Sequence, residues 1–309
     1  MRKKGLTLNQ EFILELKKIS NNVKLKEEMK LHTTFRIGGP ADYFVEPESK
    51  EEVRELLLLC RREKMPYYIL GNGSNLLVGD KGFRGLIIQI GKNLSQVTFS
   101  ENRVVTAETG VMLSKLAIQI AEKGYTGFEF AGGIPGTLGG AVTMNAGAYG
   151  GEIKDCIVSA EVIDEEGNIF VLSKEELNLG YRTSIIQQKS YIVLAASFQF
   201  EQSEKKAVLD TIADLNQRRR EKQPLNYPSA GSTFKRPEGY FAGKLIMDAG
   251  LRGYRIGGIM VSEKHCGFVV NVDNGTAKEV LMLIEEVQRR VFEQFGVHLE
   301  PEVRMIGEF

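Results

Sequence analysis

The sequence predicts an α+β fold with more than one domain, and three observations lead to this. Its 309 residues are too many for one comfortable hydrophobic core. Hydrophobic residues make up 42% and charged residues 26%, which is ordinary for a globular protein. Helix-like and strand-like segments follow one another without strict alternation, which favours α+β over a doubly wound parallel sheet.

Helices are predicted where apolar residues recur at helical spacing. Near the N-terminus, Glu11, Glu15 and Lys17 interrupt the apolar residues at that spacing, so we expect an amphipathic helix and no signal peptide. Ser49 and Thr276 each precede a glutamate by three residues, as in a capping box. The other predicted helices span residues 49–63, 113–123, 204–222 and 277–295.

Strands are predicted from β-branched and aromatic runs that end at turn residues. The sequence "EEGN" at 165–168 indicates the turn of a hairpin. A change of composition near residue 203 predicts a domain boundary. The predicted strands lie within residues 67–70, 85–90, 102–110, 157–173, 190–200 and 265–272.

Charge and cysteine content argue against several classes of protein. Lys+Arg and Asp+Glu both number 40, so no net basic charge indicates a nucleic-acid partner. No apolar run approaches the roughly 18–20 residues that cross a bilayer, so no membrane partner is expected. Cys60, Cys156 and Cys266 are far apart and lack metal-ligand spacing. We therefore expect unpaired thiols, no metal site and a reducing cytoplasm; the oligomeric state is not predicted.

The first glycine-rich segment is "GNGSN", residues 71–75. A dinucleotide fingerprint would need a third glycine where Leu76 stands, and a helix where a strand is predicted to follow. Its backbone N–H groups, with the side chains of Ser74 and Asn75, can still bind a phosphate. The alternative is a plain connector.

The second glycine-rich segment covers residues 132–151, of which eight are glycine and almost none is charged. A solvated linker would carry Ser, Lys or Glu. Backbone packed against a large flat group, such as a cofactor ring, explains the segment as well as a close-packed turn does. Two such segments suggest one extended ligand that is contacted at both ends, and a flavin dinucleotide has that shape.

Six motifs together resemble one family, the UDP-N-acetylenolpyruvoylglucosamine reductases (MurB). They occur in the family's order and cover residues from about 30 to 307. The motifs are "TTFRIGGPADYFVEP" (33–47), "ILGNGSNLLVGDKGFRGLII" (69–88), "EFAGGIPGTLGGAVTMNAGAYGGE" (129–152), "YRTS" (181–184), "SAGSTFKRP" (229–237) and "LEPEVRMIG" (299–307).

The resemblance implies a vanillyl-alcohol-oxidase (PCMH) type of FAD-binding domain in two subdomains, with a separate α+β substrate domain. We expect subdomain 1 at 1–95, with 301–309 returning to it, subdomain 2 at 96–203 and the substrate domain at 204–300. The segment after "YRTS" leaves little room for an insertion with a substrate-covering Tyr. The chain therefore resembles the shorter branch of the family.

The family reaction that the resemblance implies is the reduction of UDP-N-acetylglucosamine enolpyruvate to UDP-N-acetylmuramate. It belongs to bacterial peptidoglycan precursor synthesis, in the cytoplasm, and thereby serves cell shape and division. Non-covalent FAD is the implied cofactor and NADPH the reductant. Hydride addition to the enol ether leaves an enolate, which needs a charge-stabilising group and a proton donor.

The resemblance also implies roles for individual residues. Ser232 is the implied proton donor, and Arg182 and Glu302 the groups that stabilise the enolate; Glu300, two residues from Glu302, shares its face if the chain is extended. Candidate UDP-sugar contacts are Lys244, Tyr254, Arg255 and Asn271. The implied FAD contacts are Arg36, Gly71, Asn72, Gly73, Ser74, Asn75, Gly132, Gly133, Ile134, Pro135, Gly136, Thr137, Gly139, Gly140, Asn145, Ala146 and Gly147.

Two other functions remain open on the sequence. One is a flavin oxidase of the same fold acting on a sugar alcohol, which would not need a proton donor to carbon. The other is a nucleotide-sugar-binding protein without catalysis, which would be purified without yellow colour.

Overall fold

The chain passes several times between two units in the computed structural model, which describes residues 9–309. Of the described residues, unit 1 contains 9–25, 42–71 and 85–216, and unit 2 contains 26–41, 72–84 and 217–309. The division runs through the elements β1 (Val23–Glu28), β2 (Pro40–Val45), β5 (Phe83–Gln89) and α6 (Lys205–Lys222). The expected subdomain ranges stay a prediction, since each unit is assembled from separate stretches of the chain.

The larger sheet of unit 1 is antiparallel and has the strand order β12-β11-β13-β7-β6. Alternating apolar residues of these strands form a core with Leu113, Leu116 and Ile120 of one helix and Leu138 of another. The elements are β6 (Val97–Phe99), β7 (Val104–Glu108), β11 (Ile157–Ile163), β12 (Ile169–Ser173), β13 (Ile192–Gln199), α3 (Leu113–Glu122) and α4 (Leu138–Thr143).

A second, four-stranded sheet has the order β1-β2-β5-β3, in which β3 (Tyr67–Leu70) pairs in parallel with β5. The helices α1 (Gln10–Ile19) and α2 (Lys50–Glu63) pack beside each other, and Phe12 and Leu56 are buried in their shared core. Smaller elements complete the unit: β8 (Tyr125–Thr126), η3 (Glu129–Gly133), β9 (Gly147–Ala148), β10 (Gly151–Glu152), η4 (Ile153–Asp155), α5 (Ile185–Lys189) and β14 (Glu201–Gln202).

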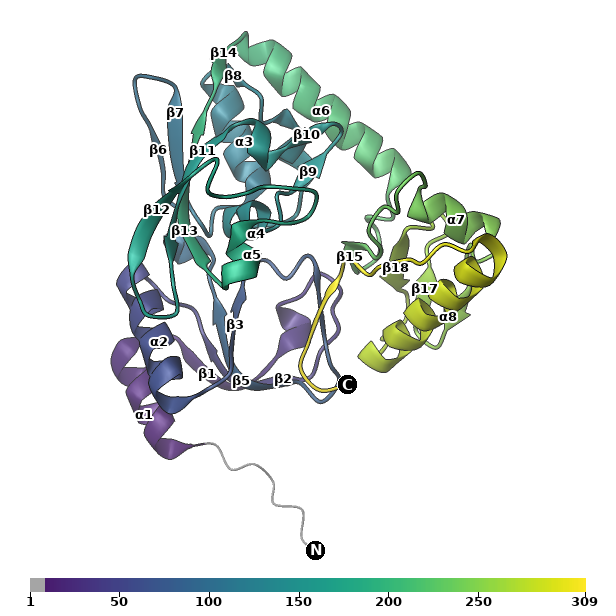
Figure 1. The fold of residues 1–309 in the computed structure, drawn as a ribbon, viewed down its shortest axis with the longest axis horizontal. Helices are drawn as coiled ribbons and strands as arrows, with labels where there is room; N and C mark the ends of the chain where they lie inside the picture. Colours follow the sequence, from purple (N-terminus) through teal and green to yellow (C-terminus); the bar gives the residue numbers. More distant parts are fainter. Residues whose placement is uncertain (1–8) are drawn as a thin grey trace, which may run out of the picture. The chain divides into compact units, whose positions relative to one another are not determined.

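Unit 2 holds an antiparallel sheet of order β15-β18-β17-β16, against which α7 and α8 pack (Figure 1). The C-terminal strand β19 (Arg304–Ile306) pairs in parallel with β4 (Leu76–Val78), so the chain's last strand meets the strand after the first glycine-rich segment. The remaining bounds are β15 (Ser229–Ser232), α7 (Ala242–Asp248), β16 (Arg255–Ile256), β17 (Ile259–Val261), β18 (Phe268–Asn271) and α8 (Ala277–Phe295).

The predicted long helices and the hairpin are confirmed. Ser49 Oγ accepts the N–H of Glu52, and Thr276 forms a complete capping box with Glu279. The predicted strand at 265–272 is shorter, because it begins at Phe268 after a turn. The amphipathic N-terminal helix is confirmed from Gln10, and residues 1–8 lie outside the described part. Short elements such as α4, α5 and α7 were not predicted, since they span too few residues to show a period.

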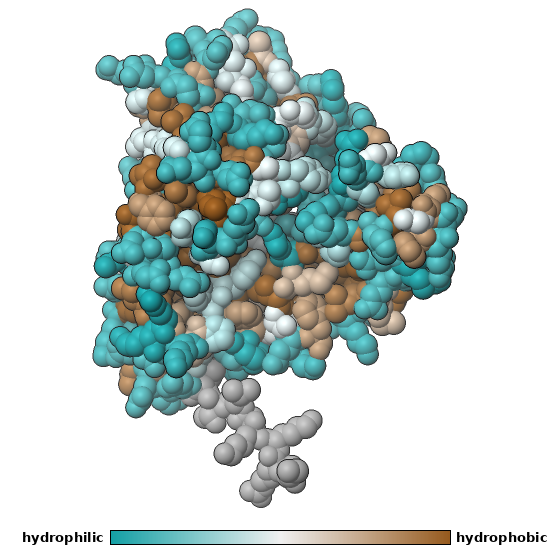
Figure 2. Space-filling model, in the orientation of Figure 1, coloured by the Kyte–Doolittle hydropathy of each residue, from teal (hydrophilic) through white to brown (hydrophobic). Residues whose placement is uncertain are grey.

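The structure also describes the surface, the helices and the three cysteines of the chain. Hydrophilic side chains cover most of the face drawn in Figure 2. Within residues 9–309, no helix combines the length and apolar character that a membrane crossing requires. Cys60, Cys156 and Cys266 are buried and unpaired, as predicted, and burial raises the pKa of Cys60 and of Cys156 to about 12.

Candidate active site

The first glycine-rich segment joins β3 to β4, so a strand follows it and the dinucleotide fingerprint is excluded. Gly73 has φ +60, and a Cβ there would lie 2.1 Å from the carbonyl oxygen of His32. Only glycine fits both the dihedral and the space. Asn75 Nδ2 donates to the carbonyl of Glu302 at 3.1 Å, which ties this loop to the segment before β19 within unit 2.

The second glycine-rich segment uses some of its glycines for internal packing. A Cβ on Gly139 would lie 2.0 Å from Thr109 Oγ1, and one on Gly132 would lie 2.8 Å from Ile212 Cγ2. Gly140, the next residue of α4, is exposed, and its nearest neighbour would be 3.9 Å away. Gly132 and Gly139 therefore fit the close-packed turn, and Gly140 is compatible with a ligand-binding surface.

The two glycine-rich segments meet within unit 1. A Cβ on Gly71 would lie 2.3 Å from Oγ1 of Thr137, so the backbone of one segment rests on a side chain of the other. Gln89 Nε2 donates to the carbonyl of Gly71 at 3.0 Å and fixes that end of the loop. The sequence predicts that both segments contact one ligand. The contact between Gly71 and Thr137 is compatible with that prediction.

Ser232 lies at the end of β15, beside a bulge. Gly231 has φ +77, and the register with β18 shifts between Ser229 and Ser232. The bulge leaves Ser232 exposed, while Ala230 and Thr233 on either side of the bulge are buried. Physical reasoning on the sequence could not choose between the two serines; the fold exposes Ser232.

Glu302 is held next to this strand. Its backbone N–H donates to the carbonyl of Thr233 at 2.8 Å, and Phe234 bridges to Pro301. The side chain of Glu300 forms an ion pair with Lys235. The structure thus holds the backbone of Glu302 beside Thr233, the residue after Ser232, and it pairs Lys235 with Glu300.

The segment "TTFRIGG" joins the same region of unit 2. Thr34 Oγ1 donates to the carbonyl of Ser229 at 2.7 Å, and its N–H donates to the carbonyl of Gly73 at 3.1 Å. Arg36 is exposed with φ +55, two residues beyond Thr34. Its place beside the first glycine loop is compatible with the expected flavin contact.

Arg182 belongs to unit 1. It has φ +56 and lies in a tight loop closed by a bridge between Gly180 and Thr183. Its guanidinium carbon lies 5.5 Å from the ring centroid of Tyr181, which is 57% exposed. Ala146 and Gly147 follow α4 in the same unit.

The expected UDP-sugar contacts all lie in unit 2, at separate places and with partners of their own. Asn271 is buried and donates from Nδ2 to the carbonyl of Phe35. The other partners are as follows: Lys244 pairs with Asp248, Tyr254 lies under the guanidinium of Arg290, and Arg255 donates to the carbonyl of Gly257.

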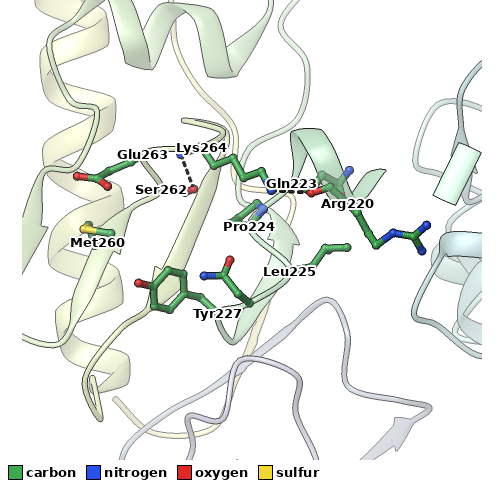
Figure 3. Close-up of a pocket in the computed structure, with 10 residues that line it drawn as sticks. Arg220, Gln223, Pro224, Leu225, Tyr227, Met260, Ser262, Glu263 and Lys264 are labelled. Atoms are coloured by element: carbon green, nitrogen blue, oxygen red, sulfur yellow. Dashed lines mark hydrogen bonds between the residues drawn. The ribbon is translucent and has the colours of Figure 1, made fainter. Parts of the chain in front are cut away.

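A pocket in unit 2 was missed by sequence reasoning. It has a volume of about 500 Å³ and lies between the loop before β15 and the end of β17. Figure 3 shows Lys264 extending across it to the carbonyl oxygen of Arg220, at 2.5 Å, with Tyr227 on another wall. The sequence gives little indication of this pocket, because the lining combines two segments that are distant in the chain, "RREKQPLNY" (219–227) and "MVSEK" (260–264). The full lining is Arg220, Gln223, Pro224, Leu225, Asn226, Tyr227, Met260, Ser262, Glu263 and Lys264.

Two protein-family models and many known proteins match this chain. The model of the UDP-N-acetylenolpyruvoylglucosamine reductase C-terminal domain matches residues 223–306, and an FAD binding domain model matches 41–173. The UDP-N-acetylenolpyruvoylglucosamine reductase of Lachnoclostridium phytofermentans is 55% identical over 306 residues, which cover 97% of this chain and 99% of that protein.

Solved structures give the same result for the fold. The UDP-N-acetylenolpyruvylglucosamine reductase of Thermus caldophilus superposes with a TM-score of 0.77 at 35% identity, over 92% of this chain and 98% of that one. A berberine bridge enzyme variant, a reticuline dehydrogenase, superposes with a TM-score of 0.50 at 17% identity, over 63% of this chain and 44% of that one. The second likeness concerns the fold alone.

Proposed function

This chain belongs to the UDP-N-acetylenolpyruvoylglucosamine reductase family, and we propose on that premise that it uses NADPH to reduce UDP-N-acetylglucosamine enolpyruvate, with Ser232 as proton donor. The chain is an FAD-dependent oxidoreductase. The observation that carries the residue roles is the pairing of Glu302 N–H with the carbonyl of Thr233, next to Ser232. This bond holds the backbone of Glu302 beside the residue that follows Ser232, and so it supports a shared role for the two residues.

The residues present fit a flavin dinucleotide. Gly140 gives an exposed, side-chain-free helix surface, and Gly71 of the first loop lies against Thr137 of the same glycine-rich segment. We propose that residues 71–75 bind the pyrophosphate through backbone N–H groups and that residues 132–147 bind the ring system. When bound, FAD supplies the hydride that adds to the enolpyruvyl double bond.

Side chains of the protein then stabilise the enolate charge and supply the proton. We propose that Arg182 stabilises the negative charge that develops on the enolate, with Glu302 acting with it. Ser232 Oγ donates its proton to the carbon that hydride did not attack. Ser232 is exposed at the strand bulge, which leaves its hydroxyl accessible to a substrate.

The pocket of unit 2 has a polar lining that is compatible with a polar ligand, and none of the proposed UDP-sugar contacts lines it. Its lining combines the ammonium of Lys264 with the amides of Gln223 and Asn226 and the ring of Tyr227. Lys244, Tyr254, Arg255 and Asn271 remain proposed contacts. Peptidoglycan precursor synthesis in a bacterial cytoplasm, and through it cell shape and division, is the biological setting proposed with this substrate.

An anaerobic absorbance titration tests the function. We expect a flavin band that bleaches with NADPH and returns on adding UDP-N-acetylglucosamine enolpyruvate. A band that only oxygen restores would favour the flavin oxidase and overturn the substrate. Absence of any flavin band after added FAD would overturn the cofactor and favour the nucleotide-sugar-binding alternative.

A further inference from the structure

Asn145 ends the helical part of the second glycine-rich segment in a strained conformation. It follows α4, has φ +45 and is only 1% exposed. An asparagine tolerates this left-handed conformation better than most residues, though at a cost relative to glycine. A buried polar side chain in such a conformation has to satisfy its hydrogen bonds inside the protein.

The amide of Asn145 makes three hydrogen bonds, all within unit 1. Nδ2 donates to Glu152 Oε2 at 2.6 Å and to the carbonyl of Gly180 at 3.0 Å. Oδ1 accepts the N–H of Lys154 at 2.9 Å. Both amide hydrogens are therefore used, and one of them holds the residue two positions before Arg182.

A second link runs from the last residue of α4. The carbonyl of Thr143 accepts Ser184 Oγ at 2.5 Å and Gln187 Nε2 at 2.8 Å. Gln187 Nε2 also donates to the carbonyl of Arg182 at 3.2 Å. The loop that carries Arg182 is thus hydrogen-bonded on both sides of the arginine to the end of the second glycine-rich segment.

We propose that Asn145 and Gln187 are positioning residues for Arg182. The inference rests on the proposed role of Arg182 at the enolate. Arg182 has φ +56 in a loop closed by the Gly180–Thr183 bridge, so its direction depends on the groups that hold this loop. The groups that hold it include Asn145, at Gly180, and Gln187, at the carbonyl of Arg182. Because both lead to residues 143–145, the segment expected to bind the flavin ring also fixes the arginine that acts on the substrate.

Asn145→Gly is the sharpest variant, because glycine keeps the left-handed backbone and removes the side chain with its amide. The two half-reactions are measured separately by stopped-flow absorbance: bleaching of the flavin by NADPH, and its reoxidation by UDP-N-acetylglucosamine enolpyruvate. We expect reoxidation to slow about 100-fold, the size of effect that a misplacement of about 1 Å produces. Bleaching by NADPH and the flavin content should fall by much less, because the amide of Asn145 is turned to Glu152, Gly180 and Lys154. Gln187→Ala should give a smaller loss of the same kind.

A double-mutant cycle with Arg182→Ala separates positioning from a direct role. Once Arg182 is absent, Asn145→Gly should cause no further slowing of reoxidation. Gln199→Ala is the matched control in the same unit, since Gln199 Nε2 donates to the backbone carbonyls of Asn102 and Arg103 instead. It should leave both half-reactions unchanged.

Failure of the inference and failure of the proposed function give different results. If Arg182→Ala slows reoxidation and Asn145→Gly does not, positioning by Asn145 is overturned. Equal slowing of both half-reactions, or loss of flavin, would overturn it in favour of a role in flavin binding or folding. If Arg182→Ala itself leaves reoxidation intact, the proposed role of Arg182 falls and the inference with it.

Discussion

Thr233 accepts the backbone N–H of Glu302 through its carbonyl at 2.8 Å, and this bond joins the end of β15, where Ser232 lies, to the segment before β19. On the other side of β15, the N–H of Thr233 donates to the carbonyl of Gly267, and its Oγ1 accepts the N–H of Val269. The backbone next to Ser232 is therefore fixed from two directions. Such support is what a proton donor needs to keep a reproducible position.

Ser232→Ala should slow the second half-reaction strongly and spare the first. Removing a positioned proton donor typically costs about 10²- to 10⁴-fold, so we expect that loss in flavin reoxidation by substrate. Reduction by NADPH should stay within about twofold, because no proton to carbon is needed there. Ser229→Ala is the control. A larger loss for Ser229→Ala than for Ser232→Ala would reverse the assignment.

Glu302→Gln and Glu300→Gln form a matched pair two residues apart. Glu300 is exposed and already paired with Lys235, and exposed ion pairs contribute little, about 0–1 kcal/mol. We expect Glu300→Gln to leave turnover nearly unchanged and Glu302→Gln to lower kcat for the UDP-sugar strongly. Steady-state measurements of kcat for both variants test this expectation. Comparable kcat values for the two would exclude a specific role for Glu302.

Gly139→Ala and Gly140→Ala should separate a packing glycine from a ligand-contact glycine. The added methyl at position 139 meets Thr109 Oγ1 at 2.0 Å, so we expect a loss of about 1–3 kcal/mol in unfolding free energy. Position 140 is open, and alanine in a helix gains about 1 kcal/mol over glycine.

For Gly140→Ala we therefore expect a more stable apoprotein that binds FAD more weakly, measured by thermal unfolding and by FAD fluorescence quenching. Unchanged FAD affinity would place the ring system away from Gly140.

His265 should make stability depend on pH. Burial lowers its pKa from 6.5, and Nδ1 accepts the N–H of Gly267 at 3.1 Å, which favours the neutral ring. As the pH falls below 6.5, the unfolded chain takes up the proton before the folded one does, so the free energy of unfolding decreases.

His265→Asn retains an acceptor and does not titrate in this range. Urea denaturation at about pH 7.5 and about pH 5.5 should show a smaller decrease for this variant than for the wild type. Identical decreases would assign the pH dependence to other groups.

The sequence by itself determined the elements with long periodic patterns and the family motifs. The stripe of α8, with Val280, Ile284, Val287 and Val291, and its capping box are local properties of the chain, so they could be predicted residue by residue. Six motifs in order identified the family, because their combination is far more specific than any one glycine loop.

Only the tertiary structure decided which glycines pack and which stay open, which of two serines is exposed, and which of two glutamates pairs with Lys235. Gly139 and Gly140 are neighbours of one residue type, and what distinguishes them is Thr109, a residue distant in the sequence. Ser232 differs from Ser229 through a bulge in the pairing with β18, and Glu300 differs from Glu302 through Lys235. These distinctions are contacts between distant segments, and no local pattern encodes them.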